Sequence, residues 1–387
     1  MKVAFVASEC VCAEGTVKDA LVLTEDGVVQ FAGSRERGSI PEGASVVDLG
    51  SCTLAPGYVD MHIHGSAGHD VMEGKPEALA AIERYLAAHG TTSYCPTTVT
   101  AHLDPTLRAL ECLADDIEDA ARHEPGEHRA RPLGVHLEGP FISKQKAGAH
   151  PVEHIRDGSV ELFDRLWQAA RGHVSVMTIA PEIPGAEDVI REATRRGVCI
   201  SLGHSNATMK ETLCGVKSGG RHVTHAFNAM RSLDHREPGI LGFALTEAQV
   251  TAEIIVDGVH VDPAVVRLFL KAKGPSGAVL VTDALSATGM PDGQYQLGGF
   301  TVDLQGDVCM SNGRLAGSVL TLGKAVRNVM KFAGWGLEDA VRLASANPAR
   351  TLGVEKRKGV IAPGADADFV VLTADGEIVL TIVGGAA

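Results

Sequence analysis

Short apolar and β-branched runs alternate in the middle of the chain with longer segments in which apolar residues recur every three or four positions. The runs are typical of buried strands, and the longer segments, such as 76–90, 106–123 and 186–197, are typical of amphipathic helices. Eight runs follow one another at the spacing of βα units, and they cover residues 58–64, 92–98, 133–139, 174–182, 199–205, 222–228, 252–260 and 278–284. This α/β pattern predicts a (β/α)₈ TIM barrel or an open doubly wound sheet.

Polar side chains at the ends of these runs favour the barrel. A closed barrel brings the C-terminal ends of all its strands to one face, whereas an open sheet brings only a few strand ends together. The polar residues at or just beyond these ends are His62, His64, Glu138, His204, His225, His260 and Asp283. We therefore predict a barrel whose mouth carries the chemistry.

The two ends of the chain predict a second, smaller domain. Residues 1–53 and 359–387 consist of short apolar runs joined by Asp-Gly and Gly turns, as in small antiparallel strands. We expect these segments to pair into one composite β-sandwich domain, with residues 54–358 forming the barrel. The glycine-rich segment 286–317 predicts a β-hairpin insertion at the rim, and residues 319–354 predict the last helical region.

Composition narrows the classes of partner. Of the 387 residues 45% are hydrophobic and 21% charged, as in soluble globular proteins, and the formal net charge is -13. This charge argues against nucleic-acid and anionic-membrane partners, which require a surplus of Lys and Arg. The eight cysteines form no C-x-x-C pair, the N-terminus lacks a signal-peptide pattern, and no apolar run is long enough to span a membrane. We expect a cytoplasmic protein with a small-molecule substrate, which a few local cations would allow to be anionic.

Two histidines in VDMHIHG lie two residues apart on a predicted strand, so both imidazoles face one side and can chelate a metal ion. Taken alone, His62 and His64 are equally well explained as two ordinary polar positions. Their place at a strand end after an Ala-Pro-Gly turn favours metal binding.

Three further residues predict a metal site at the barrel mouth. Glu138 ends the third run, and His204 and His225 end the fifth and sixth. A lone histidine at such a place is more often structural, but here two successive strands present one at the same level. Together the three residues leave positions open for water and substrate, as a catalytic zinc or iron site requires. We predict one or two divalent ions per subunit, with His62 and His64 as ligands of the second.

Asp283 follows four apolar residues, so a carboxylate emerges at the end of a buried strand. A buried carboxylate needs a partner, and metal-bound water is a suitable one. Asp283 can accept a proton from that water and later deliver it to a leaving amine. The alternative is a helix cap. His136, which shares a face with Glu138, is expected to have a supporting or structural role.

Ten motifs, in order along nearly the whole chain, resemble those of the N-acetylglucosamine-6-phosphate deacetylases of the amidohydrolase superfamily. They are PGYVDMHIHG, TSYCPTT, GVHLEGPFIS with GAH, GHSNAT, THAFNAM, HREPG, DGVHV, VTDA, LAGS, and NPAR with KG-x-I-x-PG-x-DAD. The resemblance implies a barrel with a β-sandwich from both termini, a homodimer, and hydrolysis of N-acetyl-D-glucosamine 6-phosphate to D-glucosamine 6-phosphate and acetate.

The resemblance also implies roles for individual residues. Glu138, His204 and His225 match the shared metal site, and Asp283 matches the catalytic acid and base. We expect His150 to stabilise the oxyanion together with the metal. Arg236 in HREPG is similar to an arginine that reaches the phosphate across the dimer interface. The substrate-binding positions are implied to be Ala149, His150, Asn228, Ala229, Arg236, Asp257, His260, Leu315, Ala316 and Gly317.

Other functions remain open at this point. One is a deacetylase for the galactosamine epimer, because the configuration of one hydroxyl is not legible in the residues. A metal-dependent phosphoesterase or nuclease also uses H-x-H on a similar barrel, but the acidic composition argues against it. A third alternative is a barrel without catalysis that serves as a binding module. The fourth run, VSVMTIAPE, has no lysine to bridge two metals, which argues against dihydroorotase-like and hydantoinase-like enzymes.

Overall fold

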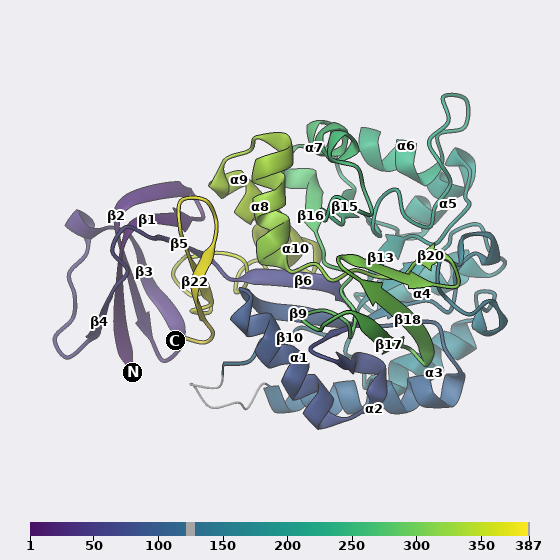
Figure 1. Cartoon of the computed structure of the whole chain (residues 1–387), viewed down its shortest axis with the longest axis horizontal. Helices are drawn as coiled ribbons and strands as arrows, with labels where there is room; N and C mark the ends of the chain where they lie inside the picture. Colours follow the sequence, from purple (N-terminus) through teal and green to yellow (C-terminus); the bar gives the residue numbers. More distant parts are fainter. Residues whose placement is uncertain (121–127, 386–387) are drawn as a thin grey trace.

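The eight predicted strands form a parallel barrel in the computed structural model, which describes residues 1–120 and 128–385 (Figure 1). A parallel bridge between Ile63 and Ala284 joins the first strand to the end of the last one. The backbone N–H of Asp283 also donates to the carbonyl of His62 at 2.9 Å. This closure excludes the open doubly wound sheet.

The barrel strands are buried, and the predicted metal ligands and Asp283 lie at their C-terminal ends or within three residues beyond them. In the order of the sheet they are β6 (Tyr58–Ile63), β9 (Thr91–Thr98), β11 (Val135–Glu138), β12 (Val174–Ile179), β13 (Cys199–Leu202), β14 (His222–Val223), β15 (Thr251–Ile254) and β16 (Ala278–Leu280). The short β10 (Arg131–Pro132) pairs with β9, and β7 (Gly65–Ser66) and β8 (His69–Asp70) form a small hairpin beyond β6.

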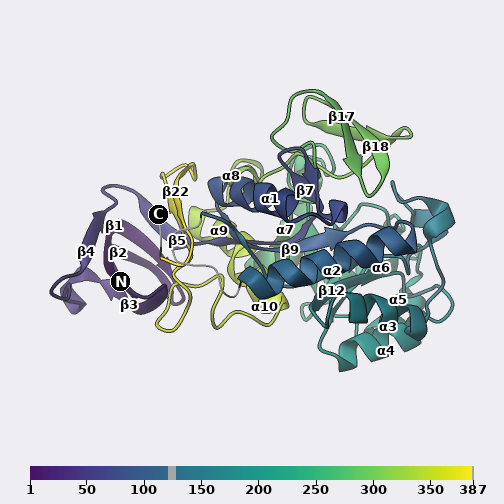
Figure 2. The same ribbon diagram turned by 90° about the horizontal axis from the view of Figure 1, so that it is seen from below.

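Helices surround the barrel, as Figures 1 and 2 show. In the fourth helix Val189 and Ile190 are buried and Glu187 and Asp188 are exposed, so the apolar stripe faces the barrel as its spacing predicts. Of the predicted helix 106–123, residues 121–123 lie outside the described part of the chain. The helices are α1 (Pro76–Ala88), α2 (Leu103–Ala120), α3 (Val160–Ala169), α4 (Ala186–Arg195), α5 (Met209–Ser218), α6 (Gly239–Thr246), α7 (Pro263–Gly277), α8 (Leu322–Ala333), α9 (Leu337–Ala344) and α10 (Ala346–Thr351).

Strands from both ends of the chain form the second β domain, at the left of Figure 1. Its core joins the termini, since the rings of Phe5 and Phe369 meet edge to face at 5.5 Å. The strands hydrogen-bond into one seven-stranded sheet of β1 (Lys2–Cys12), β2 (Gly15–Glu25), β3 (Val28–Ser34), β4 (Ser45–Asp48), β5 (Thr53–Pro56), β21 (Phe369–Leu372) and β22 (Ile378–Ile382). Because β5 belongs to this sheet, we propose that the two domains meet between β5 and β6.

One detail of this sheet differs from the expectation of antiparallel strands. The strands β4 and β5 both run parallel to β1 and pair with successive parts of it. A tight turn can join only antiparallel neighbours, but the connection 35–44 is long enough for the chain to cross over and return in parallel.

The glycine-rich segment after the eighth strand is β-structure, as predicted, but it is larger than a hairpin. It forms an antiparallel sheet of β17 (Gly293–Leu297), β18 (Phe300–Gln305), β19 (Val308–Ser311) and β20 (Arg314–Leu315). Its apolar face packs on Val99 and Leu285, next to the barrel mouth. Figure 2 shows this sheet standing out from the barrel.

Membrane crossing can be assessed from the helices. Within residues 1–120 and 128–385, none of them combines the length and the apolar character that a membrane span needs.

Candidate metal centre and substrate cavity

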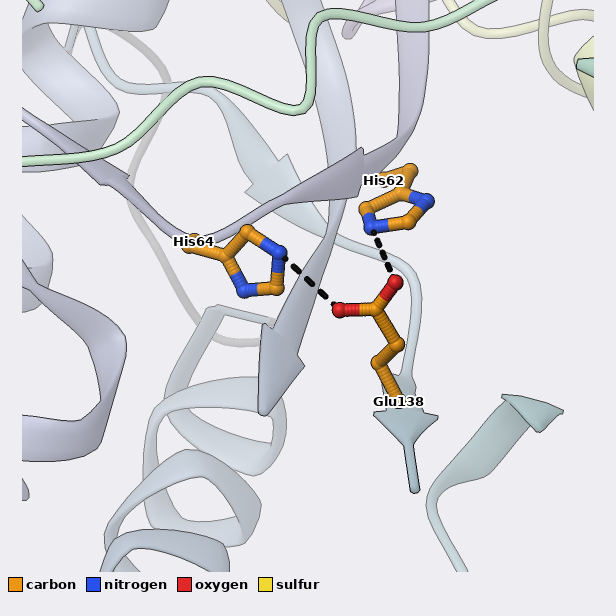
Figure 3. A group of neighbouring side chains, drawn as sticks. All are labelled: His62, His64 and Glu138. Carbon is orange, nitrogen blue, oxygen red and sulfur yellow. Dashed lines mark ion pairs between the residues drawn. The ribbon is translucent and has the colours of Figure 1, made fainter. Parts of the chain in front are cut away.

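The side chains predicted as metal ligands meet around one carboxylate, that of Glu138 at the end of β11. Its Oε1 lies 3.1 Å from Nε2 of both His204 and His225 and 3.3 Å from Nε2 of His62. Its Oε2 lies 3.3 Å from Nε2 of His64. Figure 3 shows the two histidines of the H-x-H pair facing this carboxylate. The donors fall into two groups that share Glu138, one with His62 and His64 and one with His204 and His225.

The chain bends sharply where three of these side chains leave their strands. His204, His225 and Asp283 have φ angles of 45°, 24° and 50°, in the left-handed region that residues other than glycine rarely adopt. Such backbone strain is often concentrated at functional sites, where the surrounding structure holds it. Each of the three residues directly follows buried residues, and beyond the bend His204 and His225 contact Glu138 while Asp283 contacts His64.

Hydrogen bonds fix which ring nitrogen carries the proton in His204 and His64. Nδ1 of His204 faces the carbonyl of Lys146 at 2.9 Å, and Nδ1 of His64 faces the carbonyl of Thr97 at 2.9 Å. Because a carbonyl only accepts, Nδ1 is the donor in both neutral rings, and Nε2 presents a lone pair to Glu138. Nε2 of His62 is buried and makes no hydrogen bond within the described residues. Lone pairs that face one another at about 3 Å repel unless a cation lies between them, so these donors fit a metal ion.

The pKa shifts of Glu138 and His64 also support the fit of this centre to a cation. Burial alone would raise the pKa of Glu138, but His62 and His204 hold the pKa well below its usual value. Burial alone would lower the pKa of His64, but its contacts with Asp283 and Glu138 raise the pKa to about 9. The two carboxylates therefore draw a positive charge into this space, which protons supply when no metal is bound.

Asp283 lies on the H-x-H side of the centre. Its Oδ1 is 3.2 Å from Nε2 of His64 and 3.6 Å from Nε2 of His62. Burial raises its pKa, but these two histidines outweigh burial and lower the pKa to about 2. The carboxylate is therefore ionised at neutral pH and able to accept a proton. It also stands beside the cavity, which an N-cap residue would not require.

His150 differs from the predicted ligands in its hydrogen bonding. Its Nδ1 accepts from the backbone N–H of Thr100 at 3.1 Å, so the proton of the neutral ring is on Nε2, 3.2 Å from Oε2 of Glu138. Burial, together with the nearby His204, lowers its pKa to about 4. His150 is therefore a neutral hydrogen-bond donor that points at the centre, as an oxyanion stabiliser requires.

His136 lies outside this group of donors. Its Nε2 is 2.8 Å from Oγ1 of Thr178 and its Nδ1 is 3.3 Å from Oγ1 of Thr97. Burial and the neighbouring His62 lower its pKa to about 3, so the ring is neutral. It packs edge to face on His62, with the ring centroids 4.6 Å apart. This is the supporting position that the sequence predicts.

A cavity of about 160 Å³ opens beside the centre. Most of the residues predicted to bind substrate line it, namely Ala149, His150, Asn228, Ala229, His260, Leu315, Ala316 and Gly317. Gly317 is required there by close approach, since a Cβ at this position would lie 2.9 Å from the carbonyl of Asp283 and its φ is +58°.

Two predicted substrate-binding residues are not part of the cavity lining. Among the described residues, the lining of the cavity includes neither Asp257 nor Arg236. Asp257 instead holds His260, with its Oδ2 2.6 Å from Nδ1 of that ring. Burial alone would lower the pKa of His260, but this contact raises the pKa above its usual value. Arg236 is exposed in the segment between β14 and α6.

The sequence did not indicate several residues of the site. Val99, Leu297 and Phe300 line the cavity because the insertion packs over the mouth, which no local pattern specifies. Glu253 contacts two residues of the centre, His62 and His225. A signal for Glu253 does exist, because it is a charged residue inside the apolar run 252–256.

Comparison with known proteins gives consistent matches. The amidohydrolase family model matches residues 53–387. The N-acetylglucosamine-6-phosphate deacetylase of Bacillus subtilis is 36% identical over 381 residues, which covers 95% of this chain and 96% of that protein. An N-acetylgalactosamine-6-phosphate deacetylase of Escherichia coli is 38% identical, covering 93% and 92% of the two chains. A mutant N-acetyl-D-glucosamine-6-phosphate deacetylase of Mycobacterium smegmatis, in complex with N-acetyl-D-glucosamine-6-phosphate, superposes with a TM-score of 0.91 at 33% identity, covering 100% and 98%.

Proposed function

The chain belongs to the amidohydrolase family and is a hydrolase of an amide C–N bond, and from that premise we propose that it deacetylates N-acetylglucosamine 6-phosphate to glucosamine 6-phosphate and acetate. One observation carries the proposal. Four of the five proposed metal ligands, an ionised aspartate and a neutral histidine donor line one cavity. These are the parts that hydrolysis of an unactivated amide needs.

We propose that Glu138, His204 and His225 hold the first divalent ion and that Glu138, His62 and His64 hold the second. The mixture of imidazole and carboxylate ligands suits zinc or iron. When bound, the ion supplies Lewis acidity toward a water molecule and toward the acetyl carbonyl. Glu138 can serve both groups because its Oε1 lies within 3.3 Å of Nε2 of His204, His225 and His62, and its Oε2 lies 3.3 Å from Nε2 of His64.

The chain's own residues move the proton and stabilise charge. Asp283 accepts the proton of the attacking water at its carboxylate and delivers it to the amine as the C–N bond breaks. His150 donates from Nε2 to the oxygen that develops negative charge on the former carbonyl. Leu297 and Phe300, from the insertion, place apolar surface beside the reacting groups and limit the access of bulk water.

We propose that a few cationic side chains near the cavity hold the phosphate, although the chain as a whole carries a net negative charge. His260 lines the cavity, and its contact with Asp257 favours the protonated ring. Arg236 is exposed in its own subunit, and we propose that in a homodimer it reaches the phosphate in the neighbouring site. We also propose a cytoplasmic location, which suits the free thiols of all eight cysteines.

The choice of substrate is tested by initial rates of acetate release with three sugars. We expect kcat/KM for N-acetylglucosamine 6-phosphate to exceed that for unphosphorylated N-acetylglucosamine by at least about 100-fold, because a charged site left without its dianion binds poorly. The E. coli relative at 38% identity makes the galactosamine epimer the second candidate. We expect kcat/KM for N-acetylglucosamine 6-phosphate to exceed that for N-acetylgalactosamine 6-phosphate by about 10-fold or more. A higher kcat/KM for the epimer would overturn the assignment.

A further inference from the structure

A buried carboxylate lies next to the proposed metal ligands and outside the donor set. Glu253 sits in the middle of β15, with no exposed surface. Three hydrogen-bond donors surround it. Nδ1 of His62 and the backbone N–H of His225 both lie 3.0 Å from its Oε2, and Nε2 of His222 lies 3.1 Å from its Oε1. The desolvated charge is thus satisfied by groups that belong to, or adjoin, the centre.

Two of these contacts orient the proposed ligands. An ionised carboxylate only accepts, so Nδ1 of His62 carries the proton and Nε2 turns its lone pair toward Glu138. The second contact holds the backbone of His225 at the point where φ is 24°. One side chain therefore fixes the tautomer of a ligand in one group and the backbone of a ligand in the other.

The third contact extends the network to Thr251 at the start of β15. Nδ1 of His222 lies 2.7 Å from Oγ1 of Thr251, which is two residues before Glu253 on β15. His222 in turn lies three residues before His225. The carboxylate of Glu253 is therefore held from both sides, as a group must be if it is to position others.

From this geometry we infer that Glu253 is a positioning residue for the metal centre, which holds His62 as a ligand of the ion shared with His64 and Glu138. The inference rests on the metal dependence proposed above, but not on the identity of the substrate. Outer partners of metal-bound histidines set ring orientation and ligand basicity, and their loss typically weakens metal affinity by about 10- to 100-fold.

Two conservative variants separate the effect of side-chain length at position 253 from the effect of its charge. Glu253→Gln removes the charge but keeps a carbonyl oxygen at the position that His62 and His225 address. Its amide can donate to His222, whose other nitrogen then donates to Thr251. Glu253→Asp keeps the charge, but one methylene less draws the oxygens away from His62. If Glu253 acts by positioning, the shorter side chain does more harm than the neutral one.

The experiment measures Co²⁺ binding to the metal-stripped full-length chain, without substrate, by titration of the cobalt absorption bands. We expect the wild type to bind two Co²⁺ ions. In Glu253→Gln the affinity for the second ion is expected to stay within about 10-fold of wild type, whereas in Glu253→Asp it is expected to fall by roughly 10- to 100-fold. The reverse order, unchanged affinity in both variants, or one ion in the wild type would each overturn the inference. Glu83→Gln is the matched control, because Glu83 is an equally buried carboxylate bound by Tyr94 and Arg129 away from the cavity. It is expected to change the melting temperature and leave Co²⁺ affinity unaltered.

Because substrate is absent from this titration, its outcome is independent of the deacetylase assignment. A chain that binds two ions and releases no acetate contradicts the proposed function and leaves the role of Glu253 standing. A chain that deacetylates, but whose cobalt affinity is unchanged when Glu253 is replaced, supports the proposed function and contradicts the positioning role of Glu253.

Discussion

Replacement of Asp283 by asparagine is expected to lower kcat by about 10²- to 10⁴-fold, the range that a positioned acid or base contributes. The amide has the size of the carboxylate but cannot accept the proton of the attacking water or return it to the amine. The effect is expected in kcat, with KM changed little, because the lost interaction is made mainly in the transition state.

The surroundings of Asp283 keep its carboxylate ionised. Burial would raise its pKa, but His62 and His64 lower the pKa to about 2, so the wild-type group is unprotonated at neutral pH and free to take up the proton of the attacking water. The control is the metal content of Asp283→Asn and its affinity for the product glucosamine 6-phosphate, both expected to stay near wild type. Turnover close to wild type with those two quantities unchanged would contradict the role of Asp283.

The second large effect is expected from Glu138→Gln, which should weaken metal binding by more than about 100-fold and abolish turnover with it. Loss of a group that only hydrogen-bonds to a metal ligand typically lowers metal affinity by up to about 100-fold. Glu138 is expected to matter more, because it faces four histidine nitrogens of the donor set directly. The amide removes the negative charge and turns an NH₂ group toward lone pairs of the histidines. Metal per subunit after dialysis, measured by elemental analysis, checks this expectation.

His136→Gln is the matched control for Glu138→Gln. His136 lies two residues earlier on the same buried strand, and its ring is bound to Thr97 and Thr178 outside the donor set. We expect this variant to keep its metal and most of its activity, although it loses stability. Metal retained by Glu138→Gln, or lost equally from His136→Gln, would show that Glu138 is not the shared ligand.

Much of this site could be predicted from sequence because it depends on where strands end. His62, His64, Glu138, His204, His225 and Asp283 follow buried runs, and a parallel barrel brings all such ends to one face. Period-two alternation also placed both histidines of the H-x-H pair on one side, as Figure 3 shows. The distances of 3.1–3.3 Å around Glu138 are the tertiary result of these local patterns.

Contacts between segments distant in sequence were harder to predict. The position of Phe300 in the cavity depends on how the insertion packs against Val99, about two hundred residues away in the sequence. The size of the insertion, four strands rather than a hairpin, depends on pairings among short strands whose register only the folded sheet defines. Glu253 stood out as a charge in an apolar run, but nothing local indicated that its partners are His62 and His225.

The most direct test of the central claim is acetate release from N-acetylglucosamine 6-phosphate by the metal-stripped enzyme, before and after divalent zinc or iron is restored. We expect the stripped enzyme to release acetate at the background rate. Activity is expected to return in proportion to the ion bound, with glucosamine 6-phosphate formed in an amount equal to the acetate. Full activity in the stripped enzyme, or no acetate after both metals are restored, would contradict a metal-dependent deacetylase.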